Sequence, residues 1–440
     1  MGALADKVRE AGVVGAGGAG FPTHVKYQAS VEYVIANGAE CEPLLYCDQT
    51  VMSRYSDRIV EGMSLAMKEL GAAAGIIALK KKYREAIEAL EKAIRGKPAI
   101  RLHLMDSFYP AGDEQVLVYE VLGRVVPEGG IPLQVGVVVN NVATLINVAN
   151  AAQGIPVTRR WLTVHGEVRK PLTVEVAVGT SIREVIEQAG GVTATDSVII
   201  VGGPMMGAVQ DNPDAPITKT TSGILVLPTE HSHVLRKRQS PDSILMRSKA
   251  ACDQCMHCTE LCPRFLLGHD MKPHMIMRAL PYGISDSSII TSSYLCCECG
   301  LCSYYACPLF LSPGTINSIL KSELSAKRVK NPHKRADCTP FQFREERRIP
   351  TSRLVERLGL ARYDFHTRTA DEAYIPEKVV IPLKQHVGAP AQPVVEPGMK
   401  VKEGQLLGEI PSGALSARVH ASIPGYVTSV GESVVIEAGR

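Results

Sequence analysis

The sequence predicts a multidomain protein in which an α/β domain, an α+β domain, a cysteine-rich module and a β-rich C-terminal domain follow one another. Three observations predict this fold class. The chain of 440 residues is too long for one ordinary domain, and its 45% hydrophobic and 21% charged residues are typical of globular proteins with sizeable cores. Most of its 12 cysteines lie between residues 252 and 307. Proline and glycine recur every few residues after residue 379, which favours short strands between tight turns.

The first domain is expected to be of the α/β class and to span residues 1–158. Three apolar runs read as buried strands, at residues 31–36, 75–79 and 135–139. Between them, residues 81–94 carry apolar side chains at helical spacing. Strands that alternate with helices in this way predict a sheet covered by helices.

A small α+β unit of the β-grasp type is expected over residues 159–230. Residues 161–168 and 173–178 alternate between apolar and polar like paired strands. Residues 181–189 then read as one helix, and residues 198–201 as a further strand.

The cysteine-rich module is expected over residues 245–325 and contains two groups of four cysteines, each followed by a proline. The first group has the spacing C-x2-C-x2-C-x3-C and consists of Cys252, Cys255, Cys258 and Cys262. The second has one more residue before its last member and consists of Cys296, Cys299, Cys302 and Cys307. Zinc sites usually contain two separated C-x2-C pairs, whereas triplets with a fourth cysteine before proline are typical of two [4Fe–4S] clusters.

In such modules the fourth cysteine of each group binds the cluster of the other group. Three cysteines of the first group, Cys252, Cys255 and Cys258, are therefore expected to share a cluster with Cys307. Cys296, Cys299 and Cys302 are expected to share the other cluster with Cys262. The remaining thiols, at Cys41, Cys47, Cys297 and Cys338, are expected to bind no metal.

Composition excludes several classes of function. The net charge of +3 and the absence of a basic stripe that alternates with aromatic residues give no reason to expect nucleic-acid binding. No uncharged apolar run reaches the roughly 18 residues that a membrane-spanning helix needs, and the first residues lack the pattern of a secretory signal. We therefore expect a cytoplasmic protein without membrane insertion, in which clustered thiols bind metal and do not form disulfides. A linker is expected over residues 326–375 and a β sandwich or barrel over residues 376–440.

A glycine-rich segment near the start of the chain can place backbone amides close to a phosphate. It contains Gly15, Gly17, Gly18 and Gly20, and Lys26 follows it. No clear strand precedes the segment, so on its own it could also be a flexible loop. Polar residues at the ends of predicted strands could hold a flavin, although each also reads as turn or helix-cap chemistry: Asn37, Glu40, Glu42, Glu114, Asn140, Asn141 and Thr144.

Three strings, GAGGAGFPTHVK, NGAECEP and VVVNNVATL, resemble the flavin- and NADH-binding subunit of respiratory complex I and the RnfC family. The resemblance implies that FMN binds on the glycine-rich segment with NADH stacked above it. It places Lys26, the glycines, the three asparagines and Thr144 around FMN, and Glu40 and Glu42 near flavin and nicotinamide. The segment 161–207 resembles the SLBB type of β-grasp unit.

The order of the domains distinguishes between the families that this chain resembles. In the RnfC family a barrel-sandwich hybrid domain comes first, whereas here the similar segment comes last. That order, with the strings YPAGDE, PVTRR, KTT, PSGAL and HASIPG, resembles the cobalamin reductases of propanediol-utilisation microcompartments. The resemblance implies NADH-dependent reduction of cob(III)alamin to cob(II)alamin and toward cob(I)alamin. It further implies a corrinoid adenosyltransferase and microcompartment shell proteins as partners, and a location inside a microcompartment.

Two alternatives share many of these motifs. One is an RnfC-like subunit that passes electrons between NADH and ferredoxin. The other is an electron carrier whose first domain has lost its flavin. In each case the cofactors perform the chemistry, and no side chain is expected to act as nucleophile or general acid.

Overall fold

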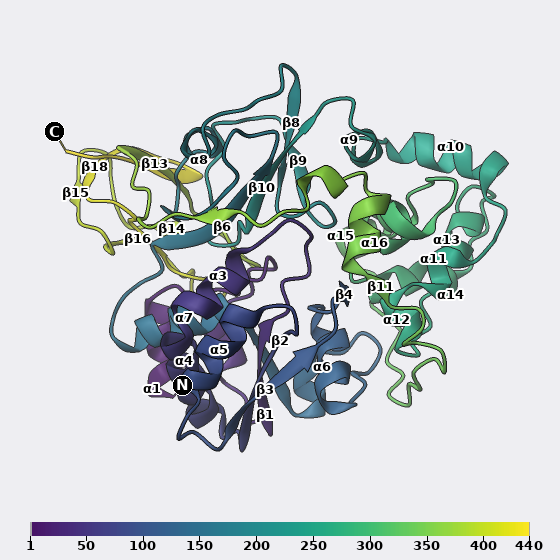
Figure 1. The fold of residues 1–440 in the computed structure, drawn as a ribbon, viewed down its shortest axis with the longest axis horizontal. Helices are drawn as coiled ribbons and strands as arrows, with labels where there is room; N and C mark the ends of the chain where they lie inside the picture. Colours follow the sequence, from purple (N-terminus) through teal and green to yellow (C-terminus); the bar gives the residue numbers. More distant parts are fainter. Residues whose placement is uncertain (1, 440) are drawn as a thin grey trace.

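The computed structural model describes residues 2–439 as four packed units and one ordered connecting segment (Figure 1). The first unit (residues 2–158) and the C-terminal unit (residues 376–439) lie on one side of the molecule, and the cysteine unit (residues 231–325) lies on the other. The second unit (residues 159–230) lies along the top of the view in Figure 1, between the C-terminal and cysteine units.

The first unit is built on a four-stranded parallel sheet with the order β3-β2-β1-β5. Strands β1, β2 and β5 are mostly apolar and buried because helices cover both faces, whereas the edge strand β3 alternates between apolar and polar residues. The strands are β1 (Tyr33–Gly38), β2 (Ala74–Lys80), β3 (Ile100–Met105) and β5 (Val137–Asn141). The helices are α1 (Ala3–Glu10), α2 (Thr23–Lys26), α3 (Cys47–Arg54), α4 (Ser56–Leu70), α5 (Arg84–Ala93), α6 (Glu114–Leu122) and α7 (Val142–Ala152). The short elements β4 (Phe108–Tyr109) and η1 (Pro132–Val135) complete the unit.

Predicted site residues gather at one edge of this sheet because parallel strands end together. Asn37 lies near the end of β1, and Asn140 and Asn141 end β5, the strand beside it. β1 has β2 on one side and β5 on the other, and ligands bind at such a change of direction in open α/β sheets. The glycine-rich segment connects α1 to α2 next to this edge.

The second unit contains a six-stranded mixed sheet with the order β12-β7-β6-β10-β8-β9. Its single helix begins at a capping box formed by Ser181 and Glu184. The unit comprises β6 (Arg159–Gly166), β7 (Leu172–Ala177), α8 (Ile182–Gln188), β8 (Ser197–Val201), β9 (Ala208–Gln210) and β10 (Gly223–Pro228). The edge strand β12 (Arg368–Thr369) comes from the connecting segment.

The cysteine unit is made of short helices around a compact apolar core. Proline stands at the first turn of four of these helices, where its missing N–H has no cost. They are α9 (Ser232–Lys237), α10 (Pro241–Ala251), α11 (His257–Glu260), α12 (Pro263–Leu266), α13 (Pro273–Ala279), α14 (Ser287–Thr291), η2 (Ser292–Leu295), the π-helical turn η3 (Cys302–Ala306) and α15 (Pro313–Ala326).

The connecting segment, residues 326–375, is ordered and packs against the other units. Its strand β11 (Ile349–Pro350) pairs with β4 of the first unit, and its helix α16 (Thr351–Arg357) buries Leu354 and Val355. A single turn, η4 (Ala361–Tyr363), leads to β12. Throughout residues 2–439 no helix is long and apolar enough to cross a membrane.

The C-terminal unit is a β sandwich, as the glycine and proline pattern predicts. One sheet has the order β13-β19-β18-β15 and the other β14-β16-β17. Ile381, Leu407 and Val427 are among the side chains buried in its core. The strands are β13 (Lys378–Pro382), β14 (Gln392–Pro393), β15 (Lys400–Val401), β16 (Leu406–Glu409), β17 (Val419–His420), β18 (Gly425–Val430) and β19 (Ser433–Glu437).

Candidate functional site

The glycine-rich segment forms a tight loop in which the first backbone amides are paired and the later ones are not. Gly18 and Gly20 have φ angles of +110° and +67°, which residues other than glycine rarely adopt. The Thr144 hydroxyl accepts a hydrogen bond from the Ala16 amide at 2.9 Å and fixes the loop to α7. Within the described chain, the amides of residues 17–20 donate no well-aligned hydrogen bond. Free adjacent amides of this kind fit an anionic phosphate.

Lys26 brings a positive charge beside this loop. Its Nζ lies 3.0 Å from Glu114 Oε1 and 3.0 Å from the carbonyl oxygen of Val139. Lys26 and Glu114, two predicted site residues that are 88 positions apart in the sequence, are therefore in direct contact.

The three asparagines at the sheet edge have different surroundings. Asn37 donates from Nδ2 to the Gly112 carbonyl at 2.8 Å, and Asn141 donates from Nδ2 to Asp48 at 2.9 Å. The side chain of Asn141 also caps α7 by accepting from the Ala143 amide. Asn140 is 3% exposed, and its Nδ2 makes no well-aligned hydrogen bond among the described residues, although its side chain lies beside the buried Tyr27 hydroxyl. A buried amide without a partner is costly, so this donor fits a polar ligand at the sheet edge.

Glu40, predicted to lie near flavin and nicotinamide, caps the start of α3 in this structure. Its carboxylate accepts hydrogen bonds from the amides of Asp48 at 2.9 Å and Gln49 at 3.3 Å, and from the Cys47 thiol at 3.1 Å. Burial, followed by the neighbouring Glu40 carboxylate, raises the pKa of Asp48 to about 7. The role of Glu40 toward a ligand stays a prediction.

Lys80 is a buried cation that the sequence analysis did not select. Its side chain is 1% exposed, and Nζ donates to the Glu40 carbonyl at 2.9 Å. Burial lowers its pKa. Its position could have indicated a site residue, because Lys80 ends the apolar run of β2 at the sheet edge where the other site residues lie.

Glu42, the second predicted acidic residue, joins the first unit to the second. Its two carboxylate oxygens accept hydrogen bonds from the amides of Met205 at 2.8 Å and Met206 at 2.7 Å. The backbone approaches so closely that a Cβ atom on Gly203 would lie 2.0 Å from Glu42 Oε2. Both predicted carboxylates are thus bound by the protein itself in this structure.

The cysteines form two groups in the crossed arrangement that the spacing predicts. Cys252, Cys255, Cys258 and Cys307 line one cavity together with His274 and Met277. The other four lie close enough to perturb one another electrostatically: Cys262, Cys296, Cys299 and Cys302. Burial raises the pKa of Cys258, Cys262 and Cys296 to about 12, so uncomplexed thiolates are unfavourable there. Bound iron would offset that cost, and eight converging sulfurs fit two iron–sulfur clusters.

The two cysteine loops have the same backbone conformation at equivalent positions. Gln254 and Met256 of the first loop have φ angles of +58° and +66°, and Glu298 and Gly300 occupy the same positions of the second at +59° and +75°. The π-helical turn η3 takes up the extra residue before Cys307. Of the remaining thiols, Cys297 lies close to the second group and interacts with Cys299. Cys41 lies outside both groups, and its Sγ accepts a hydrogen bond from the Gly112 amide at 2.5 Å.

Two buried contacts join the first unit to the cysteine unit. The Tyr109 hydroxyl donates to the Cys299 carbonyl at 2.7 Å. Asp113, the N-cap of α6, forms two hydrogen bonds with the Arg264 guanidinium, at 2.6 and 2.9 Å. Burial acts to raise the pKa of Asp113, but Arg264 outweighs it and the net shift is downward. The group containing Cys262 and Cys299 is therefore the one that faces the sheet edge.

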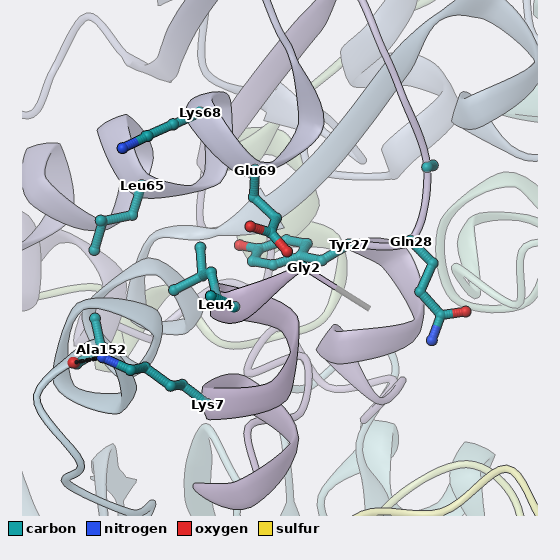
Figure 2. A pocket seen from close by; sticks show the side chains of 11 residues that line it. Gly2, Leu4, Lys7, Tyr27, Gln28, Leu65, Lys68, Glu69 and Ala152 are labelled. Atoms are coloured by element: carbon teal, nitrogen blue, oxygen red, sulfur yellow. Dashed lines mark hydrogen bonds between the residues drawn. The ribbon is translucent and has the colours of Figure 1, made fainter.

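A separate surface hollow of about 750 Å³ lies beside α1 (Figure 2). Leu4, Lys7, Tyr27, Leu65 and Glu69 are among its lining residues, and Lys7 reaches the Ala152 carbonyl across it. It contains none of the predicted cofactor residues, so it is not part of the candidate site.

Four families match consecutive parts of the chain. They are the Nuo51 FMN-binding domain over residues 8–150, the SLBB domain over 162–209, the 4Fe-4S dicluster domain over 251–312 and the RnfC barrel sandwich hybrid domain over 364–440. These matches confirm the predicted fold class and, at the level of cofactor class, the flavin and iron–sulfur predictions.

Full-length relatives include cobalamin reductase PduS of Salmonella typhimurium, which is 45% identical over 98% of this chain and 95% of its own. PduS of Citrobacter freundii shows the same identity and the same coverage. A protein of the Na(+)-translocating ferredoxin:NAD(+) oxidoreductase complex of Acetobacterium woodii is 38% identical over 59% of this chain and 58% of its own.

Proposed function

Because the chain belongs to the cobalamin reductase family, we propose that it transfers electrons from NADH to a cobalamin and reduces cobalt from Co(III) to Co(II) and toward Co(I). One observation carries this proposal: the 45% identity to PduS extends over 98% of the chain and includes the C-terminal barrel-sandwich unit. The similarity to the protein of the ion-translocating complex extends over 59% of the chain, so that function remains the weaker alternative.

The loop amides of residues 17–20, Lys26 and the free Asn140 donor would hold FMN at the sheet edge. The amides and Lys26 carry positive electrostatic potential and would bind the phosphate, whereas Asn140 would donate to a polar group of the flavin. Bound FMN would accept a hydride from NADH and release electrons singly. The chain's own part is to bind and orient, since no side chain at this edge is needed as a nucleophile.

Each group of four cysteines would hold one [4Fe–4S] cluster, which gives two clusters in the chain. Tyr109 and the pair of Asp113 and Arg264 would keep the Cys299 loop fixed against the first unit. Such rigid contacts would keep the distance between the flavin site of the first unit and the nearer cysteine group constant. Cys255 is exposed, so the group that contains it lies at the protein surface.

The partners follow from the chemistry of cobalt. Reduction of Co(II) to Co(I) is strongly uphill for NADH, so a corrinoid adenosyltransferase that traps the reduced cobalt would complete the reaction. By its similarity to the cobalamin reductases of propanediol-utilisation microcompartments, the chain would also have shell proteins as partners, which would enclose both enzymes in the cytoplasm.

The test is an anaerobic assay of protein reconstituted with iron, sulfide and FMN. With NADH and hydroxocobalamin, the wild type should produce the Co(II) spectrum, and Lys26→Met should slow its appearance at least about tenfold, the effect of losing one charge-assisted hydrogen bond. The exposed Lys97→Met variant is the matched control and should behave as the wild type. Flavin bleaching without any change in the cobalamin spectrum would refute the proposed acceptor.

A further inference from the structure

The glycine-rich loop is held by units other than its own. Its last residue, Gly20, accepts a hydrogen bond on its carbonyl from the Val387 amide of the C-terminal unit at 3.1 Å. A Cβ atom on Gly20 would lie 3.3 Å from the Gln385 carbonyl oxygen and 3.3 Å from His386 Cα. The C-terminal sandwich therefore lies directly against the end of the loop.

Lys219 connects the residues just before the glycine-rich loop to the C-terminal unit. It comes from the second unit, and Nζ donates to the Gly12 carbonyl at 2.7 Å and to the Arg418 carbonyl at 2.8 Å. Its own amide donates to Gln385 Oε1 at 2.9 Å. One side chain thus joins three units just before the loop.

The burial of Lys219 is unusual for a cation. The residue is 3% exposed, and burial without a compensating carboxylate lowers its pKa to about 7. A methionine of similar length would avoid the cost of burying the amine but would lose both contacts to carbonyl oxygens. The protein buries this amine despite the free-energy cost, which indicates that its two hydrogen bonds do more than fill the core.

Arg160 of the second unit holds the glycine-rich loop just after its first glycine. Its Nη2 donates to the Ala16 carbonyl at 2.8 Å, and its Nε donates to the Thr221 carbonyl at 2.7 Å. Arg160 lies on β6, and Thr221 lies two residues after Lys219, so Arg160 also contacts the turn that carries Lys219. The loop is therefore fixed before its first glycine, just after that glycine and at its end.

We propose that the C-terminal barrel-sandwich unit supports the flavin-binding site by holding its glycine-rich loop, and that Lys219 is a positioning residue that preorganises this phosphate-binding loop. This inference rests on the proposed function, because it requires that the loop binds the FMN phosphate. A loop held in its bound conformation loses less entropy on binding, so the clamp increases affinity without touching the ligand.

The test measures binding of flavin to the cluster-containing, flavin-free protein under anaerobic conditions. Lys219→Met should weaken FMN binding about tenfold, as expected when one or two hydrogen bonds that support the loop are lost. Binding of riboflavin, which lacks the phosphate, should change less than about twofold on the same scale. The exposed Lys402→Met variant in the C-terminal unit is the matched control and should bind both flavins as the wild type does.

Equal affinities of wild type and Lys219→Met for FMN would overturn the inference, and so would equal losses for FMN and riboflavin, which indicate a general structural defect. If Lys219→Met fails to fold, Gln385→Leu removes the acceptor of the Lys219 amide and should give the same selective loss. A wild-type protein that binds no FMN would instead overturn the proposed function itself.

Discussion

Asn140 has a buried amide donor that makes no well-aligned hydrogen bond within residues 2–439. Its neighbour Asn141 has the opposite arrangement, because its side chain caps α7 and also donates to Asp48. In the proposed site, Asn140 serves ligand binding and Asn141 serves folding, so the two adjacent asparagines provide a matched pair for mutation.

Asn140→Ala should lower the affinity for FMN about tenfold and change the free energy of unfolding of the flavin-free protein by less than about 1 kcal/mol, because the removed donor has no partner there. Asn141→Ala should lower the free energy of unfolding by about 1 kcal/mol, the usual cost of losing an N-cap. Flavin titration and denaturant unfolding measure the two quantities. A large loss of stability in Asn140→Ala would contradict its assignment as a free donor.

Asp48 should give the sheet edge a measurable dependence on pH. Its pKa in the folded protein is about 7, raised by burial and by Glu40, whereas the pKa of an ordinary aspartate is 3.8. The folded state binds more protons between these values, so stability should fall as pH rises from about 5 to about 7, by up to about 1.4 kcal/mol per pH unit. Asp48→Asn should lack this slope. Denaturant unfolding of both proteins across this range would refute the assignment if the slopes were equal.

The sequence indicated Glu40 and Glu42 but not what they contact. Both carboxylates accept backbone amides, and for Glu42 those amides lie 163 and 164 residues away. Contacts over such distances arise from the packing of units, which periodicity and spacing do not contain. The position of Lys80 at the end of the apolar run of β2 was visible in the sequence, but its burial depends on packing between segments that are far apart in the chain.

At the scale of elements, the cysteine loops were predictable because their chemistry fixes their spacing. The apolar runs of β1, β2 and β5 were predictable as well, because both faces of a parallel sheet are buried. The short strands β11 and β12 were not, because two residues carry no periodic pattern and pair only when another unit supplies the partner strand. The extra residue before Cys307 was visible in the sequence, whereas the π-helical turn that absorbs it was not.

Iron content tests the assignment of the cysteine groups. Cys255→Ser should remove the cluster held by its group, so the reconstituted protein should lose about half of its iron and acid-labile sulfide relative to the wild type. Cys338→Ser should retain the full content, since Cys338 lies outside both groups and donates only to the Arg335 carbonyl. A full iron content in Cys255→Ser, or a loss in Cys338→Ser, would contradict the ligand sets.

At the scale of the whole molecule, the four units are arranged around the edge of one sheet. The second and C-terminal units hold the glycine-rich loop, and the cysteine unit meets the same region through Tyr109 and Asp113. Sequence alone predicted the order of the units along the chain but not this convergence. The connecting segment illustrates the difference, because its residues complete sheets in two other units.

We propose that electrons accepted in the first unit reach cobalamin through the cysteine unit. The most direct measurement is anaerobic stopped-flow mixing of FMN-loaded protein with NADH and hydroxocobalamin, following flavin and cobalamin absorbance together in the wild type and in Cys255→Ser. We predict that NADH bleaches the flavin at the same rate in both proteins, whereas Co(II) formation slows at least about tenfold in the variant, equivalent to about 1.4 kcal/mol in the barrier. Undiminished Co(II) formation in Cys255→Ser would contradict the claim.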